Sequence, residues 1–173
     1  MERTHSGKLI ARTEPMMYDV GVLGKFQTSN GNYYYIYYYI IEKMHVIKND
    51  DDIKKDFMNL ISLFEKFTDK IIRDIPELKT IYINLLGKED VSNYDEQLIA
   101  LMPIIIEYFN DNFLFKVDNL ISKINEAYSL HENWVDLLIE EFIIKKITGR
   151  FDLHSGNVGI TNNGQIRFFD PAI

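Results

Sequence analysis

Nine consecutive aromatic and aliphatic residues, YYYIYYYII at positions 33–41, limit what this chain can fold into. Tyr and Ile favour extended backbone, and no other stretch predicts a strand so strongly. Because every position is aromatic or aliphatic, the pattern does not single out a buried face, and we expect both faces to be covered at least in part. Residues 16–23 alternate as a second strand, and residues 24–32 predict the hairpin loop between the two.

The middle of the chain carries apolar residues at the three- and four-residue spacings of helices. Asp50–Asp52 are candidate caps for the first helix, Pro103 predicts a kink or break in the third, and Asn110–Asn112 predict a second break there. Strands, then helices, then a closing hairpin indicate one compact α+β domain. The four predicted helical stretches are residues 50–73, 77–86, 95–128 and 131–147.

The C-terminal stretch FDLHSGNVGITNNGQIRFFDP places oxygen-bearing side chains around a predicted hairpin. Asp152 lies five residues before Asn157, and the hairpin should return Asp170 close to Asn157. Asn and Asp oxygens suit a hard cation such as Mg²⁺, and a further carboxylate beside it can accept the proton of an attacking hydroxyl. The pattern predicts phosphoryl transfer; the alternative is an ordinary polar loop followed by a hairpin.

This stretch resembles the catalytic and metal-binding loops of the protein-kinase-like superfamily, which includes aminoglycoside phosphotransferases and small kinase-like proteins of bacteriophages and large DNA viruses. The resemblance implies that Asp152 is the catalytic-loop aspartate. It also implies that Asn157 and Asp170 hold the Mg²⁺ that accompanies ATP. His154 stands where protein kinases usually carry Lys, and two roles stay open for it: contact with a phosphate oxygen, or a hydrogen bond within the loop.

The N-terminal strands are similar to the last two strands of a kinase small lobe and the hinge that follows them, with YIIEKM at positions 39–44 as the hinge. In the family, hinge backbone groups contact adenine. The resemblance therefore implies that the backbone of Glu42 and Met44 binds the nucleotide and that the side chain of Ile41 lines the back of the pocket.

The resemblance also implies an architecture, namely an α+β, kinase-like fold with a mostly helical large lobe, a reduced N-terminal antiparallel sheet and a C-terminal catalytic hairpin. Residues 1–173 would form a single kinase-like domain. Within it, residues 1–45 would provide the small-lobe strands and the hinge, and residues 46–173 the helical lobe with the catalytic loop.

The sequence departs from the family in several places. Arg150 stands where a His is usual, and Pro171-Ala172 follow Asp170 in place of Phe-Gly. The sequence lacks the glycine-rich loop and the Val-Ala-Ile-Lys strand that clamp the phosphates in the family, and Lys8 is a poor substitute for that lysine. Three hypotheses follow. The chain is an ATP- and Mg²⁺-dependent phosphotransferase acting on a hydroxyl, or it is a catalytically impaired relative that binds another protein, such as a viral host factor. The third is a structural α+β protein in which the motif arose by chance.

The composition of the chain argues against nucleic acid and membrane as binding partners. The net charge of −7 argues against nonspecific binding to nucleic acid, and no basic residue interleaves the aromatic run that could otherwise stack on bases. The chain has no cysteine, no signal-peptide pattern and no apolar run long enough to span a membrane. We therefore expect a cytoplasmic protein that binds a nucleotide and a protein partner or substrate, and neither nucleic acid nor membrane.

Overall fold

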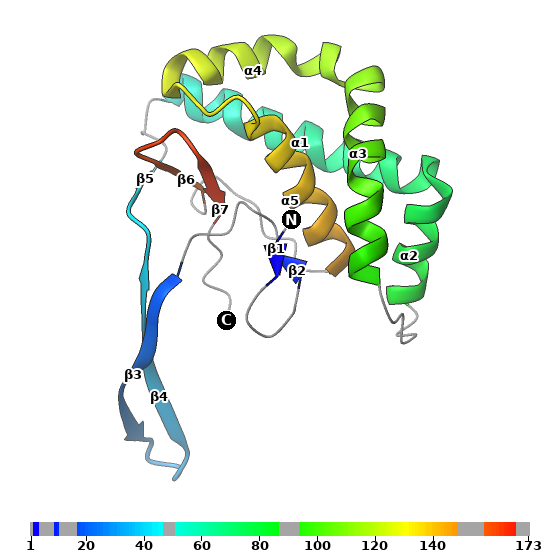
Figure 1. Cartoon of the computed structure of the whole chain (residues 1–173). Coiled ribbons are helices and arrows are strands. Elements are labelled where there is room, and N and C mark those ends of the chain that lie inside the picture. Colours follow the sequence, from blue (N-terminus) through cyan, green and yellow to red (C-terminus); the bar gives the residue numbers. More distant parts are fainter. Residues whose placement is uncertain are drawn as a thin grey trace.

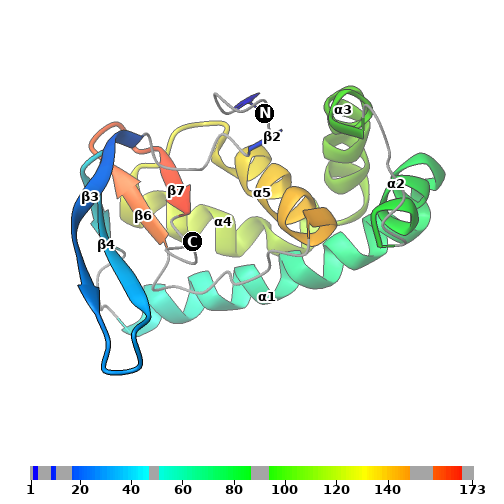
Figure 2. The same ribbon diagram turned by 90° about the horizontal axis from the view of Figure 1, so that it is seen from below.

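The computed structural model describes residues 2–3, 9–10, 17–46, 51–86, 94–148 and 158–168. In this part of the chain, a helical body carries a projecting two-stranded ribbon and a small three-stranded sheet (Figures 1 and 2). The expected α+β class is confirmed. The strands are β1 (Glu2–Arg3), β2 (Leu9–Ile10), β3 (Met17–Gln27), β4 (Tyr33–Ile41), β5 (Met44–Val46), β6 (Val158–Thr161) and β7 (Ile166–Phe168). The helices are α1 (Asp51–Asp74), α2 (Pro76–Leu86), α3 (Tyr94–Asn112), α4 (Leu114–Tyr128) and α5 (Trp134–Thr148).

Helix α1 is the centre of the body, and the other four helices all pack against it or against its neighbours. Its buried residues Phe57, Phe64 and Ile71 recur at helical spacing, as the sequence predicts. The ring of Phe64 lies 4.9 Å from that of Phe109 in α3 and 5.7 Å from that of Phe142 in α5, centroid to centroid. These aromatic contacts make one continuous core under the helices.

Helices α3 and α4 meet at an angle of 93°, with Phe113 between them. Phe113 is buried and stacks on Phe67 of α1 at a centroid distance of 4.4 Å. The break predicted at Asn110–Asn112 falls at this corner, whereas Pro103 lies inside α3 without ending it. Pro103 lies on the exposed side of α3, so its ring does not interrupt the buried side, which continues beyond it.

No single helix in the described ranges has both the length and the apolar composition to cross a membrane. The bent pair of α3 and α4 passes that test only when its two helices are taken together.

Strands β3 and β4 form an antiparallel ribbon that projects from the helical body (Figure 1). β3 extends to Gln27, although a loop was expected from residue 24, because the long β4 continues to pair with it as far as Tyr33. Tyr38 lies across Gly21, where a Cβ would come 2.6 Å from its ring, and its hydroxyl donates a hydrogen bond to Asp19 at 2.9 Å. That hydrogen bond raises the pKa of Tyr38.

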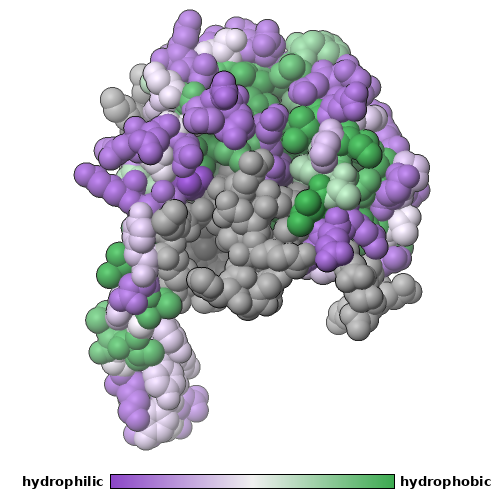
Figure 3. All heavy atoms as spheres, in the orientation of Figure 1, coloured by the Kyte–Doolittle hydropathy of each residue, from purple (hydrophilic) through white to green (hydrophobic). Residues whose placement is uncertain are grey.

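The expectation that both faces of this ribbon are covered is wrong. Side chains of β4 at positions 33–37 are between 49% and 58% exposed, and so are apolar residues of β3 such as Val20 and Val22. Figure 3 shows the apolar side chains of the ribbon standing clear of the body. The side chains of a strand point alternately to its two faces, but apolar residues at every position do not show that another element packs on either face.

Strands β5, β6 and β7 form a small antiparallel sheet with β6 in the middle. Val158 lies opposite Phe168, which confirms the predicted C-terminal hairpin, and its turn uses Gly164 at φ +72°. The backbone N–H of His131 donates to the Gly164 carbonyl at 2.9 Å. The turn of the hairpin therefore lies on the connection between α4 and α5.

Candidate functional site

The three-stranded sheet brings the predicted hinge segment beside the predicted catalytic hairpin. Met44 of β5 lies opposite Thr161 of β6, and Val46 lies opposite Gly159. These pairs join two parts of the chain that are more than 100 residues apart, with all five helices between them. Met44, at the end of the predicted hinge, therefore pairs directly with the hairpin that the sequence places between Asn157 and Asp170.

Three side-chain contacts reinforce this sheet. Arg167 of β7 forms an ion pair with Glu42, and the two side chains are only 12% and 14% exposed. Arg167 also donates a hydrogen bond to Gln165 at 2.7 Å. On the exposed side, His45 Nε2 and Asn162 Oδ1 lie 2.8 Å apart. Glu42 in the hinge segment and His45 just after it are thus both held against the hairpin.

A glycine permits the close approach of β5 to β6. A Cβ built at Gly159 would lie 2.8 Å from Met44 Cβ and 3.0 Å from its sulfur. Any side chain at position 159 would therefore push β5 away from β6. The resemblance implies a backbone role for Met44 toward adenine, which stays a prediction; the structure shows that the Met44 side chain packs against β6 at Gly159.

The predicted hinge residues occupy distinct positions. Ile41 is the last residue of β4, opposite Met17, and its side chain is partly exposed. Glu42 follows directly and uses its side chain for the ion pair with Arg167. Local sequence patterns could not find that pair, because its two residues are 125 positions apart.

The other predicted site residues, Asp152, His154, Asn157 and Asp170, lie outside the described residues, as do Arg150 and Lys8. The described hairpin begins one residue after Asn157 and ends two residues before Asp170. Within the described ranges, no group of three or more His, Asp or Glu side chains is arranged to hold a metal ion.

Helices α3 and α5 border a cavity of about 720 Å³. Its floor includes Glu140, which is only 2% exposed, and its rim carries Glu107 and Asp111 beside apolar residues of α3 such as Met102 and Ile106. A concave surface of this charge suits an apolar or cationic group. It includes no residue of the three-stranded sheet.

A second cavity, of about 530 Å³, lies between α1, α2 and α5. It is lined by the basic side chains of Lys66, Arg73, Lys79 and Lys146. Lys146 Nζ lies 2.8 Å from Asp69 Oδ1, and this hydrogen bond raises the pKa of the lysine. The surface is cationic, although the pair with Asp69 already neutralises one of its charges.

Comparison with protein-family models, with curated proteins and with solved structures finds no match for this chain. Membership of the protein-kinase-like superfamily therefore stays a prediction from the motif. A function has to be proposed from that motif and from the sheet that carries it.

Proposed function

We propose that this chain is a kinase-like protein that transfers the γ-phosphoryl group of ATP to a hydroxyl of its acceptor, with Mg²⁺ as the cofactor ion. The observation that carries the proposal is the pairing of β5 with β6. It supports the proposal because Met44, at the end of the segment proposed to hold adenine (residues 41–44), pairs with the hairpin whose flanks in the sequence carry the proposed phosphate and metal residues.

The register of the hairpin supports the metal site. Because Val158 lies opposite Phe168, the chain enters and leaves the hairpin at the same end. Asn157 is joined directly to Val158, and Asp170 follows Phe168 by two residues. With about 3.8 Å between consecutive Cα atoms, these attachments allow both side chains to reach one Mg²⁺ and its short ligand shell.

The roles then follow from chemistry. Asn157 and Asp170 would hold the ion, which neutralises the charge on the phosphates. Asp152 would accept the proton of the attacking hydroxyl, and His154, two residues later, would contact a phosphate oxygen. A site of this kind acts by positioning, and the ion pair of Glu42 with Arg167 supplies a fixed platform for it.

Nucleotide binding tests the proposal without knowledge of the acceptor. We expect ATP with Mg²⁺ to raise the melting temperature of the wild type. The Asp170→Ala variant should bind ATP without the added effect of Mg²⁺, whereas Asp118→Ala, which removes an exposed carboxylate on α4, should behave like the wild type. No stabilisation of the wild type by millimolar ATP and Mg²⁺ would reject the proposal.

Phosphoryl transfer needs a second measurement. Label from [γ-³²P]ATP should appear in an acceptor, or in the chain itself, with the wild type and not with Asp152→Asn. Nucleotide binding by Asp152→Asn should be retained, because that residue is proposed to act on the acceptor. Equal transfer by the two proteins would reject the role of Asp152.

A second candidate function is supported by the projecting ribbon, whose apolar side chains are exposed on both faces. A kinase-like protein without the phosphate-clamping loop could serve mainly as a protein-binding module. Binding of a partner with no stabilisation by ATP would favour this second function.

A further inference from the structure

The outer edge of β4 is a long strand edge with no partner in the described part of the chain. Its nine residues pair with β3 on one side only. The two register shifts of the ribbon place the extra residues, Tyr18 and Leu23, in β3, so β4 itself runs without a bulge. A regular edge of this kind presents a row of backbone donors and acceptors to any strand that approaches.

β4 also lacks the features that usually protect an edge strand. It contains no Pro, no Gly and no charged residue from Tyr33 to Ile41. Edge strands that stay single are commonly blunted by Lys, Pro or bulges. β3 has such features in Lys25 and its two bulges, so the β3 edge of the ribbon is protected and the β4 edge is not.

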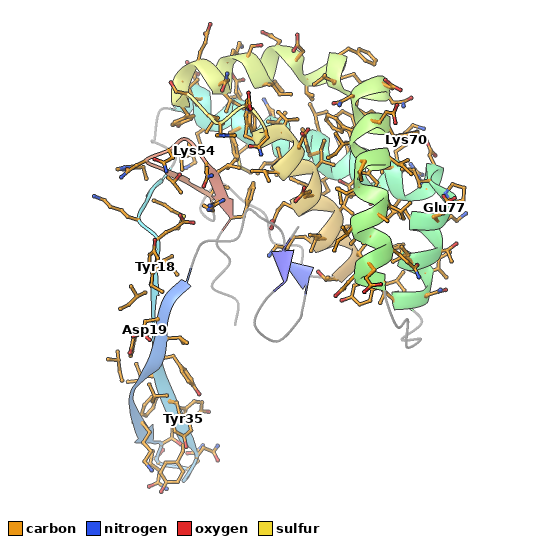
Figure 4. The ribbon with its side chains drawn as sticks, in the orientation of Figure 1. Tyr18, Asp19, Tyr35, Lys54, Lys70 and Glu77 are labelled. Atoms are coloured by element: carbon orange, nitrogen blue, oxygen red, sulfur yellow. The ribbon has the colours of Figure 1, made fainter. Side chains whose placement is uncertain are left out.

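The side chains of β4 add apolar surface on both faces of that edge. Tyr33, Tyr35 and Tyr37 share one face, where the rings of Tyr35 and Tyr37 lie 6.4 Å apart. Tyr34 and Ile36 lie on the other face, where Tyr34 stacks on Phe26 at 5.5 Å. Tyr35, which is 54% exposed, lies on the projecting ribbon away from the helical body (Figure 4). A two-stranded ribbon is marginal alone, and further strands make it stable.

We propose that β4 pairs with β4 of a second copy of this chain. The two strands would run antiparallel about a two-fold axis at Tyr37, the central residue of β4. All nine residues then pair, with Tyr33 opposite Ile41 of the second copy. The product is a four-stranded sheet in which the two β4 strands are central and the two bulged β3 strands form the edges.

Charge allows a second copy as the occupant, because the pairing strand itself is uncharged. The chain carries a net charge of −7, which would normally oppose self-association. β4 contributes nothing to that charge, and the ribbon projects from the helical body, so the two bodies stay apart in the pair (Figure 1). The pairing strand can therefore approach its own copy without bringing like charges of the strand together.

The surface area that the two β4 strands would bury is also large enough for a specific dimer. Nine residues at about 3.4 Å each give an edge of ~30 Å. With tyrosine rings on both faces, such an edge buries on the order of 500–600 Å² per copy, which brings the pair to the ~1,000 Å² expected of a specific interface. Tyrosine is also a residue type enriched at interfaces, because its ring packs while its hydroxyl stays hydrated.

The mass of the wild type in solution is the first test. Light scattering coupled to size exclusion at tens of micromolar should give twice the chain mass of 20.4 kDa. The double variant Tyr35→Lys/Tyr37→Lys should give the monomer mass, since the charges at position 37 would face each other at the axis and those at position 35 would lie diagonally beside them. Phe115→Lys, which alters an apolar side chain on α4 that is 70% exposed, should remain dimeric. A monomeric wild type, or a dimer that the double variant leaves intact, would overturn the proposal.

A cross-link tests the register. The chain has no cysteine, so a single engineered thiol reports on one position. Directly opposed residues of antiparallel strands have Cα atoms about 4.5–5.5 Å apart, within the range of a disulfide. Tyr37→Cys should oxidise to a covalent dimer, and Phe115→Cys should not. Equal cross-linking of the two, or none at position 37, would reject pairing at this axis. Neither test involves nucleotide, so the outcome is independent of the proposed phosphotransferase activity.

Discussion

Glu42 and Arg167 form an ion pair across 125 residues of sequence, and it connects the end of the ribbon to the last strand of the C-terminal hairpin. Both side chains are largely buried. Ion pairs in such surroundings are costly to break, because the remaining charge stays in a medium of low polarity. The pair is thus a structural link between the two halves of the proposed site.

We expect Arg167→Gln to lower the free energy of unfolding by about 2–3 kcal/mol, somewhat less than for a fully buried pair. Lys123→Gln, which removes one member of a more exposed pair with Asp56, should cost less than about 1 kcal/mol. Urea denaturation of both variants measures the difference. Equal effects would mean that burial of the Glu42–Arg167 pair does not matter.

Gly164 and Gly31 are matched glycines with positive φ, +72° and +85°. A Cβ at Gly164 would lie 2.5 Å from the carbonyl oxygen of Ser129, whereas at Gly31 the nearest atom is 4.0 Å away. Gly31→Ala should cost only the backbone penalty of about 1 kcal/mol. Gly164→Ala should cost at least about 2 kcal/mol, because the hairpin turn must also move away from the α4–α5 connection. Thermal unfolding distinguishes the two; similar losses would contradict the contact with Ser129.

Phe113 and Phe115 lie two residues apart at the corner of α3 and α4, in opposite environments. Phe113 is 2% exposed and stacks on Phe67, whereas Phe115 is 70% exposed. Phe113→Ala should therefore lower the free energy of unfolding by about 3–5 kcal/mol. Phe115→Ala should change it by no more than about 0.5 kcal/mol. Chemical denaturation followed by circular dichroism tests this pair, and a small effect at Phe113 would show that the corner is not packed as described.

Asp74 accepts hydrogen bonds from Lys70 and from the Tyr108 hydroxyl, and these lower the pKa of its carboxyl below the usual 3.8. A lowered pKa in the folded state means stability that is present above pH 3.8 and is lost as the pH falls through the folded-state pKa. The difference in unfolding free energy between the wild type and Asp74→Asn should therefore shrink below about pH 4. Urea titrations between pH 7 and pH 3 measure it, and a difference independent of pH would contradict the assignment.

Much of the helical body could be predicted from sequence, because its signals are local. The apolar spacing of residues 50–73 anticipates α1 to within one residue at each end. The polar run at Asn110–Asn112 marks the corner between α3 and α4. Of the kink or break predicted at Pro103, the break is wrong, because α3 continues through this residue, whereas the kink stays a prediction.

Features of the ribbon and of the candidate site that depend on long-range contacts could not be predicted from local sequence patterns. The length of β3 depends on its partner strand, so its glycines did not end it at residue 24. Exposure of β4 on both faces could not be read from a sequence that looks fully apolar. The contact of Glu42 with Arg167, and of Met44 with Gly159, depends on how all five helices fold back. No periodicity connects residues so distant in the chain.

The order of the three-stranded sheet has a consequence for folding kinetics. β5 and β6 are separated by more than 100 residues, while the helices between them make contacts at shorter range. Closing an unstructured loop of that length costs about 4 kcal/mol in chain entropy, so the sheet should form after the helical body has shortened the gap. Unfolding that starts by release of β5 would then separate the hinge from the hairpin while the helices remain intact.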